Sequence, residues 1–185
     1  EELEAPNIQF HYAPAMVIDH GRKSAWGTGM SCHSCLLRPK SRGEVTLESS
    51  DPFADPLIDP KFLSHPDDMQ DMIDGYKIMM KVLNTEPFSK YIKEHTSRPI
   101  DINDDADIEK AIREEADTVY HPVGTCKMGS DDMSVVSHEL KVHKIANLRV
   151  VDASIMPTLV GGNTNAPTIM IGEKASDLIK ADWAI

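Results

Sequence analysis

The longest regular alternation of apolar and polar residues lies in the middle of the chain and predicts a helix over residues 65–84. Its apolar side chains recur every three or four positions: Met69, Met72, Ile73, Tyr76, Met79, Met80 and Leu83. Ser64 precedes this run as a candidate cap, and Asp67 and Asp68 would lie in the first turn, where the helix dipole favours negative charge. A methionine-rich stripe of this kind is typical of a helix face that packs into the core.

Three further segments have helical character. A short helix is expected over residues 87–94, a longer one over 105–116, and a last one over 166–181. The side chains that the last helix is expected to bury are Ile169, Met170, Ala175, Leu178 and Ile179. Gly172 would lower the stability of this helix by roughly 1 kcal/mol relative to alanine, so a close packing contact is expected there.

Period-two patterns predict extended segments in the first part of the chain. Residues 7–18 and 29–37 alternate in this way, and Val45 and Leu47 mark a further strand. We expect the strand over 29–37 to pair with the strand around Val45 in antiparallel fashion, because the connection between them is too short for a crossover. The proline-rich residues 50–60 are expected to form an irregular loop with a short extended piece near its end.

The segment from Leu148 to Asp152 predicts a buried strand of a parallel sheet, since its apolar run ends at an acid followed by small residues. Gly161 and Gly162 follow, and Pro167 lies in the first turn of the final helix, where proline favours helix initiation. Ligands in open α/β folds bind at the carboxyl ends of strands, beside helix N-termini. The connection between this strand and helix therefore predicts a ligand site.

The charge of the chain limits its partners. Its 185 residues include 30 acidic and 19 basic side chains, which gives a formal net charge of −11. A nucleic-acid partner is not expected, because phosphate binding requires a basic surface. No run of about 18 apolar residues occurs, so no transmembrane helix is expected. The N-terminus has no apolar signal core, which favours a cytoplasmic protein, with attachment to the surface of the inner membrane as an alternative.

The cysteines do not predict a metal site. Cys32, Cys35 and Cys126 form no disulfide framework, as expected of reduced thiols in the cytosol. The gap between Cys32 and Cys35 suits zinc, but a structural zinc site needs four ligands and no second close pair occurs. A thioredoxin-type redox pair is disfavoured because no βαβ pattern surrounds it. The alternation instead places this stretch in the strand over 29–37.

A histidine lies in an unusual loop between Tyr120 and Gly129. Pro122 biases His121 toward an extended backbone, and Gly124 follows closely. Histidine is the side chain best suited to proton transfer near neutral pH. A histidine in a loop rich in glycine and proline is more often structural than catalytic, so the residues alone leave both interpretations open.

The motifs of this chain resemble those of the glucose–methanol–choline (GMC) oxidoreductases, a family of FAD-dependent alcohol oxidases and dehydrogenases. Five segments carry the resemblance in the family's order: LRPKSRG at 37–43, LIDP at 57–60, HPVGTCKMG at 121–129, LRVVDASIMP at 148–157 and GNTNAPT at 162–168. The resemblance points to the choline dehydrogenase-like branch and, within it, to enzymes for aliphatic primary alcohols. The family's GxGxxG dinucleotide fingerprint does not occur in this chain, which therefore resembles the C-terminal part of a longer family member.

The resemblance implies an α+β fold with two parts. Residues 1–145 would form the C-terminal substrate-binding part, an antiparallel sheet with flanking helices. Residues 146–185 would form a strand–helix segment that completes an FAD-binding α/β domain.

The resemblance also implies FAD as the cofactor and assigns roles to residues. His121 matches the family's active-site histidine, which takes the proton of the substrate hydroxyl as hydride leaves the carbinol carbon for flavin N5. Asn163 matches the second active-site position and would hold the substrate oxygen. The residues implied near FAD are Asp152, Ala153, Asn165, Ala166 and Thr168. Because Pro167 has no N–H, the Thr168 amide is the expected donor at the start of the last helix.

The implied substrate is a small-molecule alcohol, a primary alcohol oxidised to an aldehyde, and either oxygen or a quinone would accept the electrons. Choline is the alternative substrate, although a cation calls for aromatic faces or a carboxylate that this chain does not reveal. The contrasting interpretation is a stand-alone domain without catalysis. The presence of both His121 and Asn163 argues against lost chemistry, whereas the missing fingerprint suggests that this chain alone is inactive.

Overall fold

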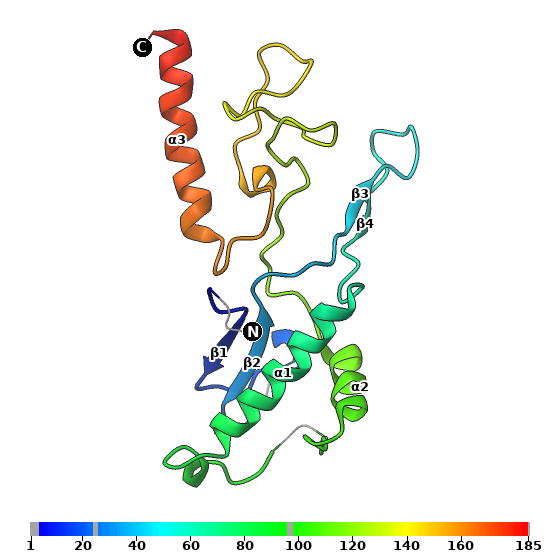
Figure 1. Ribbon diagram of the computed structural model, residues 1–185, viewed down its shortest axis with the longest axis vertical. Helices are drawn as coiled ribbons and strands as arrows, with labels where there is room; N and C mark the ends of the chain where they lie inside the picture. Colours follow the sequence, from blue (N-terminus) through cyan, green and yellow to red (C-terminus); the bar gives the residue numbers. More distant parts are fainter. Residues whose placement is uncertain (1–3, 24–25, 96–97, 185) are drawn as a thin grey trace. The chain divides into compact units, whose positions relative to one another are not determined.

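The chain forms two compact units, each assembled from two stretches of sequence. The computed structural model describes residues 4–23, 26–95 and 98–184. The first unit comprises residues 1–41 and 63–119, and the second comprises residues 42–62 and 120–185 (Figure 1). These units are defined by contacts within this chain. The division near residue 145 concerns the longer family member and stays a prediction.

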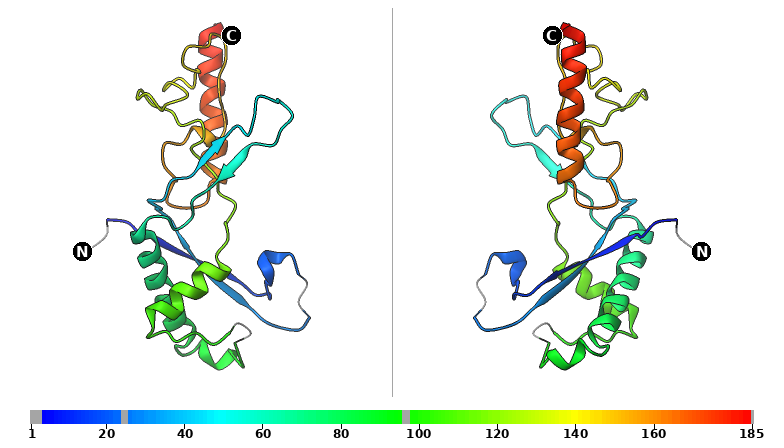
Figure 2. Two further views of the ribbon diagram at one scale, coloured as in Figure 1. Left: turned by 90° about the vertical axis from the view of Figure 1, so that its right-hand side faces the viewer. Right: turned by 90° about the vertical axis from the view of Figure 1, so that its left-hand side faces the viewer.

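The first unit is a two-stranded antiparallel sheet covered by helices. β1 (Ile8–Ala13) pairs with β2 (Ser31–Leu36), with Ile8 opposite Leu36 at one end. α1 (Pro66–Leu83) packs across these strands, and α2 (Asp105–Glu115) packs against α1 (Figure 2). Two single 3-10 turns complete the unit: η1 (Asp19–Gly21) and η2 (Ser89–Tyr91).

The second unit combines a small hairpin, a long irregular segment and the last helix. Its regular elements are β3 (Glu44–Thr46), β4 (Leu57–Asp59), the 3-10 turn η3 (Ala153–Ile155) and α3 (Asn165–Trp183). β3 and β4 pair with each other in antiparallel fashion. Together with the first unit, these short antiparallel sheets and helices confirm the expected α+β class.

The three long predicted helices are confirmed. Two details differ from the prediction, the cap of the first helix and the length of the short helix after it. α1, α2 and α3 correspond to the helices expected over residues 65–84, 105–116 and 166–181. The cap of α1 is His65 rather than Ser64, because the His65 Nδ1 accepts the N–H of Asp67 at 3.2 Å. The helix expected over 87–94 is reduced to η2, since the backbone becomes extended at Ile92.

The methionine stripe of α1 is core, as predicted. Met69 and Ile73 are buried against Ile108 and Ile112 of α2. Half-buried apolar side chains surround this cluster: Leu63, Met72, Tyr76 and Ile100. The core of the first unit therefore forms between α1 and α2, and it relies on the helical spacing of the apolar residues.

The predicted pairing of β2 with the strand around Val45 is wrong. β2 pairs with β1, and β3 pairs with β4. The chain between β2 and β3 is anchored elsewhere, because the N–H groups of Lys40 and Ser41 each donate to the Asp68 carboxylate at 2.8 Å. This anchor at the start of α1 prevents the chain from folding back as a tight hairpin.

The parallel strand predicted over residues 148–152 does not form within the described part of the chain. The N–H of Val142 donates to the Leu148 carbonyl at 2.9 Å, and the N–H of Val150 donates to the Leu140 carbonyl at 3.2 Å. The segment thus makes short antiparallel contacts with its own neighbourhood. These contacts occupy backbone groups that a parallel ladder would require.

α3 buries a narrower face than predicted. Ile171 and Ala175 are buried four positions apart, and Leu178 packs beside them. The buried residues of this core are Val136, Leu140, Ile155, Met156, Ile171 and Ala175. Burial is confirmed for Ala175, and Leu178 is half-buried, but the prediction is wrong for three exposed side chains: Ile169, Met170 and Ile179. Only one stripe of α3 contacts the irregular segment, and these three lie outside it.

Two helical glycines have opposite surroundings and give a testable contrast. A Cβ at Gly172 would meet no heavy atom within 4 Å, so the close packing expected there is absent from the described part of the chain. A Cβ at Gly75 of α1 would lie 3.1 Å from Ile8 Cδ1 and 3.2 Å from Ile8 Cγ1 and Cγ2. Alanine at position 75 would therefore require the Ile8 side chain to shift by a few tenths of an ångström.

We expect Gly172→Ala to raise the free energy of unfolding of this chain by about 1 kcal/mol, because alanine restricts the unfolded chain and meets no obstacle in the helix. Gly75→Ala, the matched control, should give no such gain, since the β-branched Ile8 side chain has little freedom to move. Urea unfolding followed by circular dichroism measures both. Equal stabilisation by the two substitutions would contradict this account of Gly75.

Candidate active site

His121 lies in a loop whose backbone is held in unusual conformations. The residue before it, Tyr120, has a φ of 62°, in the left-handed region that bulky residues rarely adopt. Gly124 has a φ of 88°, and a Cβ there would lie 3.3 Å from the Met156 carbonyl oxygen. Glycine at this position therefore permits the loop to pack closely on the segment after η3. Strained backbone of this kind clusters at functional sites.

Two backbone hydrogen bonds join the histidine loop to η3. The N–H of Cys126 donates to the Ser154 carbonyl at 3.0 Å, and the N–H of Met128 donates to the Ile155 carbonyl at 2.8 Å. Ile155 is buried in the core of the second unit. The histidine loop is consequently fixed to the same segment that leads, a few residues later, to Asn163.

The structure brings His121 and Asn163 together, although they lie 42 positions apart in the sequence. The Asn163 Nδ2 is 3.4 Å from the His121 Nε2. The amide donates to Nε2 when the imidazole is neutral and carries its proton on Nδ1. A separation of 3.4 Å is longer than an ordinary hydrogen bond, so the two side chains are in contact but their hydrogen bond is weak.

The N-terminus of α3 begins two residues after Asn163. Its cap, Thr164, has a helical backbone and its side chain makes no capping hydrogen bond. The first intrahelical bond runs from the Thr168 N–H to the Thr164 carbonyl at 3.0 Å. The amides of Asn165 and Ala166 precede that bond and have no helical acceptor.

This geometry changes the assignment of the donors. The Thr168 amide, expected from the resemblance to face the flavin, is already engaged with Thr164. Pro167 has no N–H, so Asn165 and Ala166 carry the amides that remain at the helix start. A helix N-terminus with two such amides carries partial positive charge and favours a partially negative group.

Asp152 and Ala153 form the turn that enters η3. The Asp152 Oδ1 accepts the N–H of Ser154 at 2.7 Å, so this carboxylate caps the short 3-10 turn. No hydrogen bond to the backbone N–H of either Asp152 or Ala153 is present within the described ranges. Their side chains thus serve the local structure, and their amides are the groups left for a ligand.

The cysteine stretch lies in β2, which confirms the strand expected there. Successive side chains of a strand point to opposite faces, so Cys32 and Cys35 are on different faces of β2. The Cys35 Sγ lies 3.3 Å from the His11 Nε2 of β1, and burial raises the pKa of both thiols. Among the residues that the structure describes, no three potential ligands gather as a metal site.

Sequence reasoning missed the contact between Cys35 and His11. The alternation of each strand is visible in the sequence, but the contact depends on the register, which places Gln9 opposite Cys35 and His11 opposite His33. A raised thiol pKa describes an un-ionised thiol rather than a reactive thiolate. This contact stabilises the sheet and does not join the site around His121.

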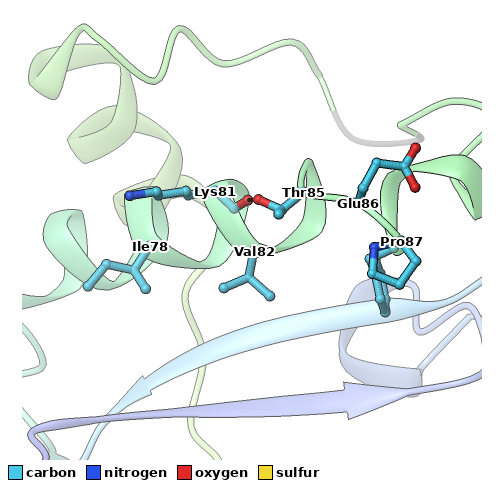
Figure 3. Close-up of a pocket in the computed structure, with 7 residues that line it drawn as sticks. Ile78, Lys81, Val82, Thr85, Glu86 and Pro87 are labelled. Carbon is cyan, nitrogen blue, oxygen red and sulfur yellow. Dashed lines mark hydrogen bonds between the residues drawn. The ribbon is translucent and has the colours of Figure 1, made fainter.

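A shallow hollow of about 350 Å³ lies in the first unit, at the end of α1 (Figure 3). Its lining residues are Ile78, Lys81, Val82, Thr85, Glu86, Pro87 and Phe88. Neither His121 nor Asn163 lines it, so the hollow and the candidate chemistry are separate features.

No helix within the described ranges has the length and apolar character needed to cross a bilayer.

The pairing of a loop histidine with an amide beside a helix N-terminus brings a candidate base and a candidate hydrogen-bond donor to one point. A family model described as GMC oxidoreductase matches residues 39–172 of the chain. The chain belongs to the GMC oxidoreductase family.

Relatives of this chain include enzymes that act on alcohols. It is 50% identical over 185 residues to the alcohol dehydrogenase [acceptor] of Pseudomonas putida, covering 99% of this chain and 34% of that protein. It is 43% identical over 180 residues to the oxygen-dependent choline dehydrogenase of Cronobacter sakazakii, covering 97% of this chain and 32% of that protein. The chain thus spans about a third of the length of these relatives.

Solved structures with the same fold include two oxidases. A formate oxidase of Aspergillus oryzae, whose FAD modification has been studied, superposes with a TM-score of 0.91 at 30% identity, covering 97% of this chain and 32% of that one. Pyridoxine 4-oxidase from Mesorbium loti superposes with a TM-score of 0.84 at 27% identity, covering 93% of this chain and 34% of that one. The chain is therefore homologous to a C-terminal part of FAD-dependent oxidoreductases that act on CH–OH donors.

Proposed function

We propose that this chain supplies the proton acceptor and the oxygen-binding amide of an FAD-dependent alcohol dehydrogenase that oxidises a primary alcohol to an aldehyde. His121 takes the hydroxyl proton, and Asn163 holds the substrate oxygen. The observation that carries this proposal is the approach of the Asn163 Nδ2 to 3.4 Å from the His121 Nε2, across 42 positions of sequence. A substrate oxygen could be shared by both side chains at such a site.

The chemistry requires a base that is neutral before reaction. A neutral imidazole with its proton on Nδ1 presents the Nε2 lone pair to a hydroxyl, and this is the same form that accepts from Asn163. Proton transfer to a positioned base contributes about 10²–10⁴-fold in rate. The Asn163 amide donates a hydrogen bond to the oxygen, and this bond strengthens as negative charge develops there.

The residues around α3 fit an FAD. The uncapped amides of Asn165 and Ala166 suit the pyrimidine end of a flavin, where negative charge develops on reduction. The backbone N–H groups of Asp152 and Ala153 are further donors for the cofactor. FAD, when bound, would supply the hydride acceptor for the reaction. Thr168 has no such role in this proposal, because its amide is used inside the helix.

A quinone is proposed as the electron acceptor of the full-length protein. The alcohol dehydrogenase relative is named for an acceptor, whereas the choline dehydrogenase relative is named for oxygen. The identity of 50% to the first, against 43% to the second, favours the former type. Steady-state turnover with a soluble quinone, compared with oxygen uptake, tests this choice.

Choline is the second candidate substrate, since a choline dehydrogenase is 43% identical over 180 residues. The test is flavin reduction in a full-length protein that contains this chain, with a linear primary alcohol and with choline supplied separately without acceptor. Faster reduction by the neutral alcohol supports the proposal. Reduction by choline alone would favour the alternative, and reduction by neither would support a non-catalytic domain.

We expect Asn163→Ala to raise the activation free energy of flavin reduction by about 1–3 kcal/mol, because one hydrogen bond to a developing negative charge is lost. Asn163→His is the control, since histidine retains a donor at this position and should preserve most of the rate. Stopped-flow absorbance with a primary alcohol measures both. A deuterium label at the carbinol carbon should still slow Asn163→Ala, and loss of this isotope effect would contradict a rate-limiting hydride step.

A further inference from the structure

The Thr164 carbonyl, at the start of α3, accepts two hydrogen bonds from one residue. The Thr168 N–H donates to it at 3.0 Å, and the Thr168 Oγ1 hydroxyl donates to it at 2.7 Å. Both lone pairs of this oxygen are therefore used. The Thr168 side chain is half-buried, which limits the competition of water for the hydroxyl bond.

This double contact fixes the residue that follows Asn163. Thr164 takes a helical backbone, with φ −86° and ψ −10°, instead of the extended conformation usual at a cap, and its own side chain makes no capping bond. Threonine in a helix commonly bonds the carbonyl four residues before it, and here that bond falls on the cap itself. The backbone direction at Thr164 determines where the adjoining Asn163 points.

We propose that Thr168 is a positioning residue: its hydroxyl, through the Thr164 carbonyl, holds the Asn163 amide toward the His121 imidazole. This inference rests on the proposed function for its catalytic readout. It replaces the expectation that Thr168 serves the flavin through its amide. The two hypotheses assign function to different groups of Thr168. The positioning role requires its hydroxyl, whereas flavin binding would require only its backbone N–H.

The test uses Thr168→Val and Thr168→Ser in a full-length protein that contains this chain. Valine keeps the shape and the amide but lacks the hydroxyl, whereas serine keeps the hydroxyl. We expect Thr168→Val to slow flavin reduction by a primary alcohol about 5- to 10-fold, the effect of one lost hydrogen bond, and Thr168→Ser to stay within about twofold of the parent. Flavin absorbance should show full FAD content in both. Where Asn163→Ala itself slows flavin reduction, equal rates in the valine and serine variants would overturn the inference.

A double-mutant cycle identifies the route of the effect. If Thr168 acts through Asn163, Thr168→Val should change the rate by less than about twofold in an Asn163→Ala background. A full further loss in that background would overturn the positioning role.

A readout without catalysis separates this inference from the proposed function. In protein labelled with ¹⁵N-asparagine, the Asn163 side-chain amide resonance is identified by its absence in Asn163→Ala. We expect it to shift in Thr168→Val and to stay in place in Thr168→Ser. A shift in the valine variant supports the positioning role even where Asn163→Ala reduces flavin at the parent rate, a result that would contradict only the proposed function. An unmoved resonance in Thr168→Val overturns the positioning role.

Discussion

Replacing His121 with alanine is expected to slow flavin reduction by a primary alcohol about 10²-fold or more, while FAD stays bound. The substitution removes the group proposed to accept the hydroxyl proton, and alanine offers no replacement for it. FAD retention follows from the proposed contacts, since these come from the backbone near Asp152 and from the start of α3 rather than from the histidine loop. Stopped-flow flavin absorbance measures the rate, and the protein-to-flavin absorbance ratio measures FAD content.

The matched control is His138→Ala, which removes an exposed histidine of the same compact unit. It should leave the reduction rate unchanged. The isotope effect from a deuterated carbinol carbon should persist in the His121 variant, because hydride transfer still occurs. Reduction at the parent rate in His121→Ala, with FAD intact, would remove this side chain from the mechanism and leave only an analogy of fold.

The sequence alone was sufficient for the helices that carry the structure. α1 and α2 follow from local spacing of apolar residues, because each helix needs one continuous stripe to reach the core. The strand pairing could not be predicted in the same way. It depends on the capture of Lys40 and Ser41 by Asp68, a contact across 28 and 27 positions that leaves no local signal.

For the candidate site as well, the sequence predicts the residues but not the contact between them. His121 and Asn163 could be singled out from glycine- and proline-rich loops and from family resemblance. Their approach depends on backbone hydrogen bonds from Cys126 to Ser154 and from Met128 to Ile155. No local sequence pattern predicts these hydrogen bonds. The hydrogen bonds of Thr168 could not be predicted either, because they depend on where the first helical hydrogen bond falls.

The exposure of three apolar side chains on α3 also has a physical explanation. Ile169, Met170 and Ile179 were expected in the core because they share a helix with Ala175, but a helix contacts one neighbour through only one stripe. Apolarity on several sides of a helix is typical of burial by more than one neighbour. The apolar residues of α3 exceed what its contacts with the other described residues require.

The largest expected loss of stability comes from Asp68→Ala. Asp68 is 2% exposed and accepts hydrogen bonds from the Lys40 N–H and the Ser41 N–H at 2.8 Å each, and from the Ser41 hydroxyl at 2.5 Å. Alanine would leave these donors without their acceptor at a half-buried site, so we expect the free energy of unfolding to fall by roughly 3 kcal/mol. Urea unfolding followed by circular dichroism at pH 7 measures the change.

The neighbouring carboxylate provides the control. Asp67 lies in the same first turn of α1, but it is exposed and its salt bridge with Lys40 is open to solvent. Asp67→Ala should therefore cost less than about 1 kcal/mol. Comparable losses in the two variants would show that the helix dipole, rather than the buried hydrogen bonds, accounts for the effect.

The pH dependence of the free energy of unfolding provides a second test of the contribution of Asp68. Burial by itself raises the pKa of this carboxyl, but the hydrogen bonds from Ser41 and from the Lys40 amide outweigh burial, so the pKa lies below its ordinary value. A carboxyl whose pKa is lower in the folded state contributes stability that is present above the unfolded pKa, about 3.9, and is lost as the pH falls through the folded pKa. Asp68→Asn cannot titrate, so its deficit relative to the parent should be full near pH 7 and shrink below about pH 4. A deficit that stays constant across this range would place the effect in packing rather than in the ionised carboxylate.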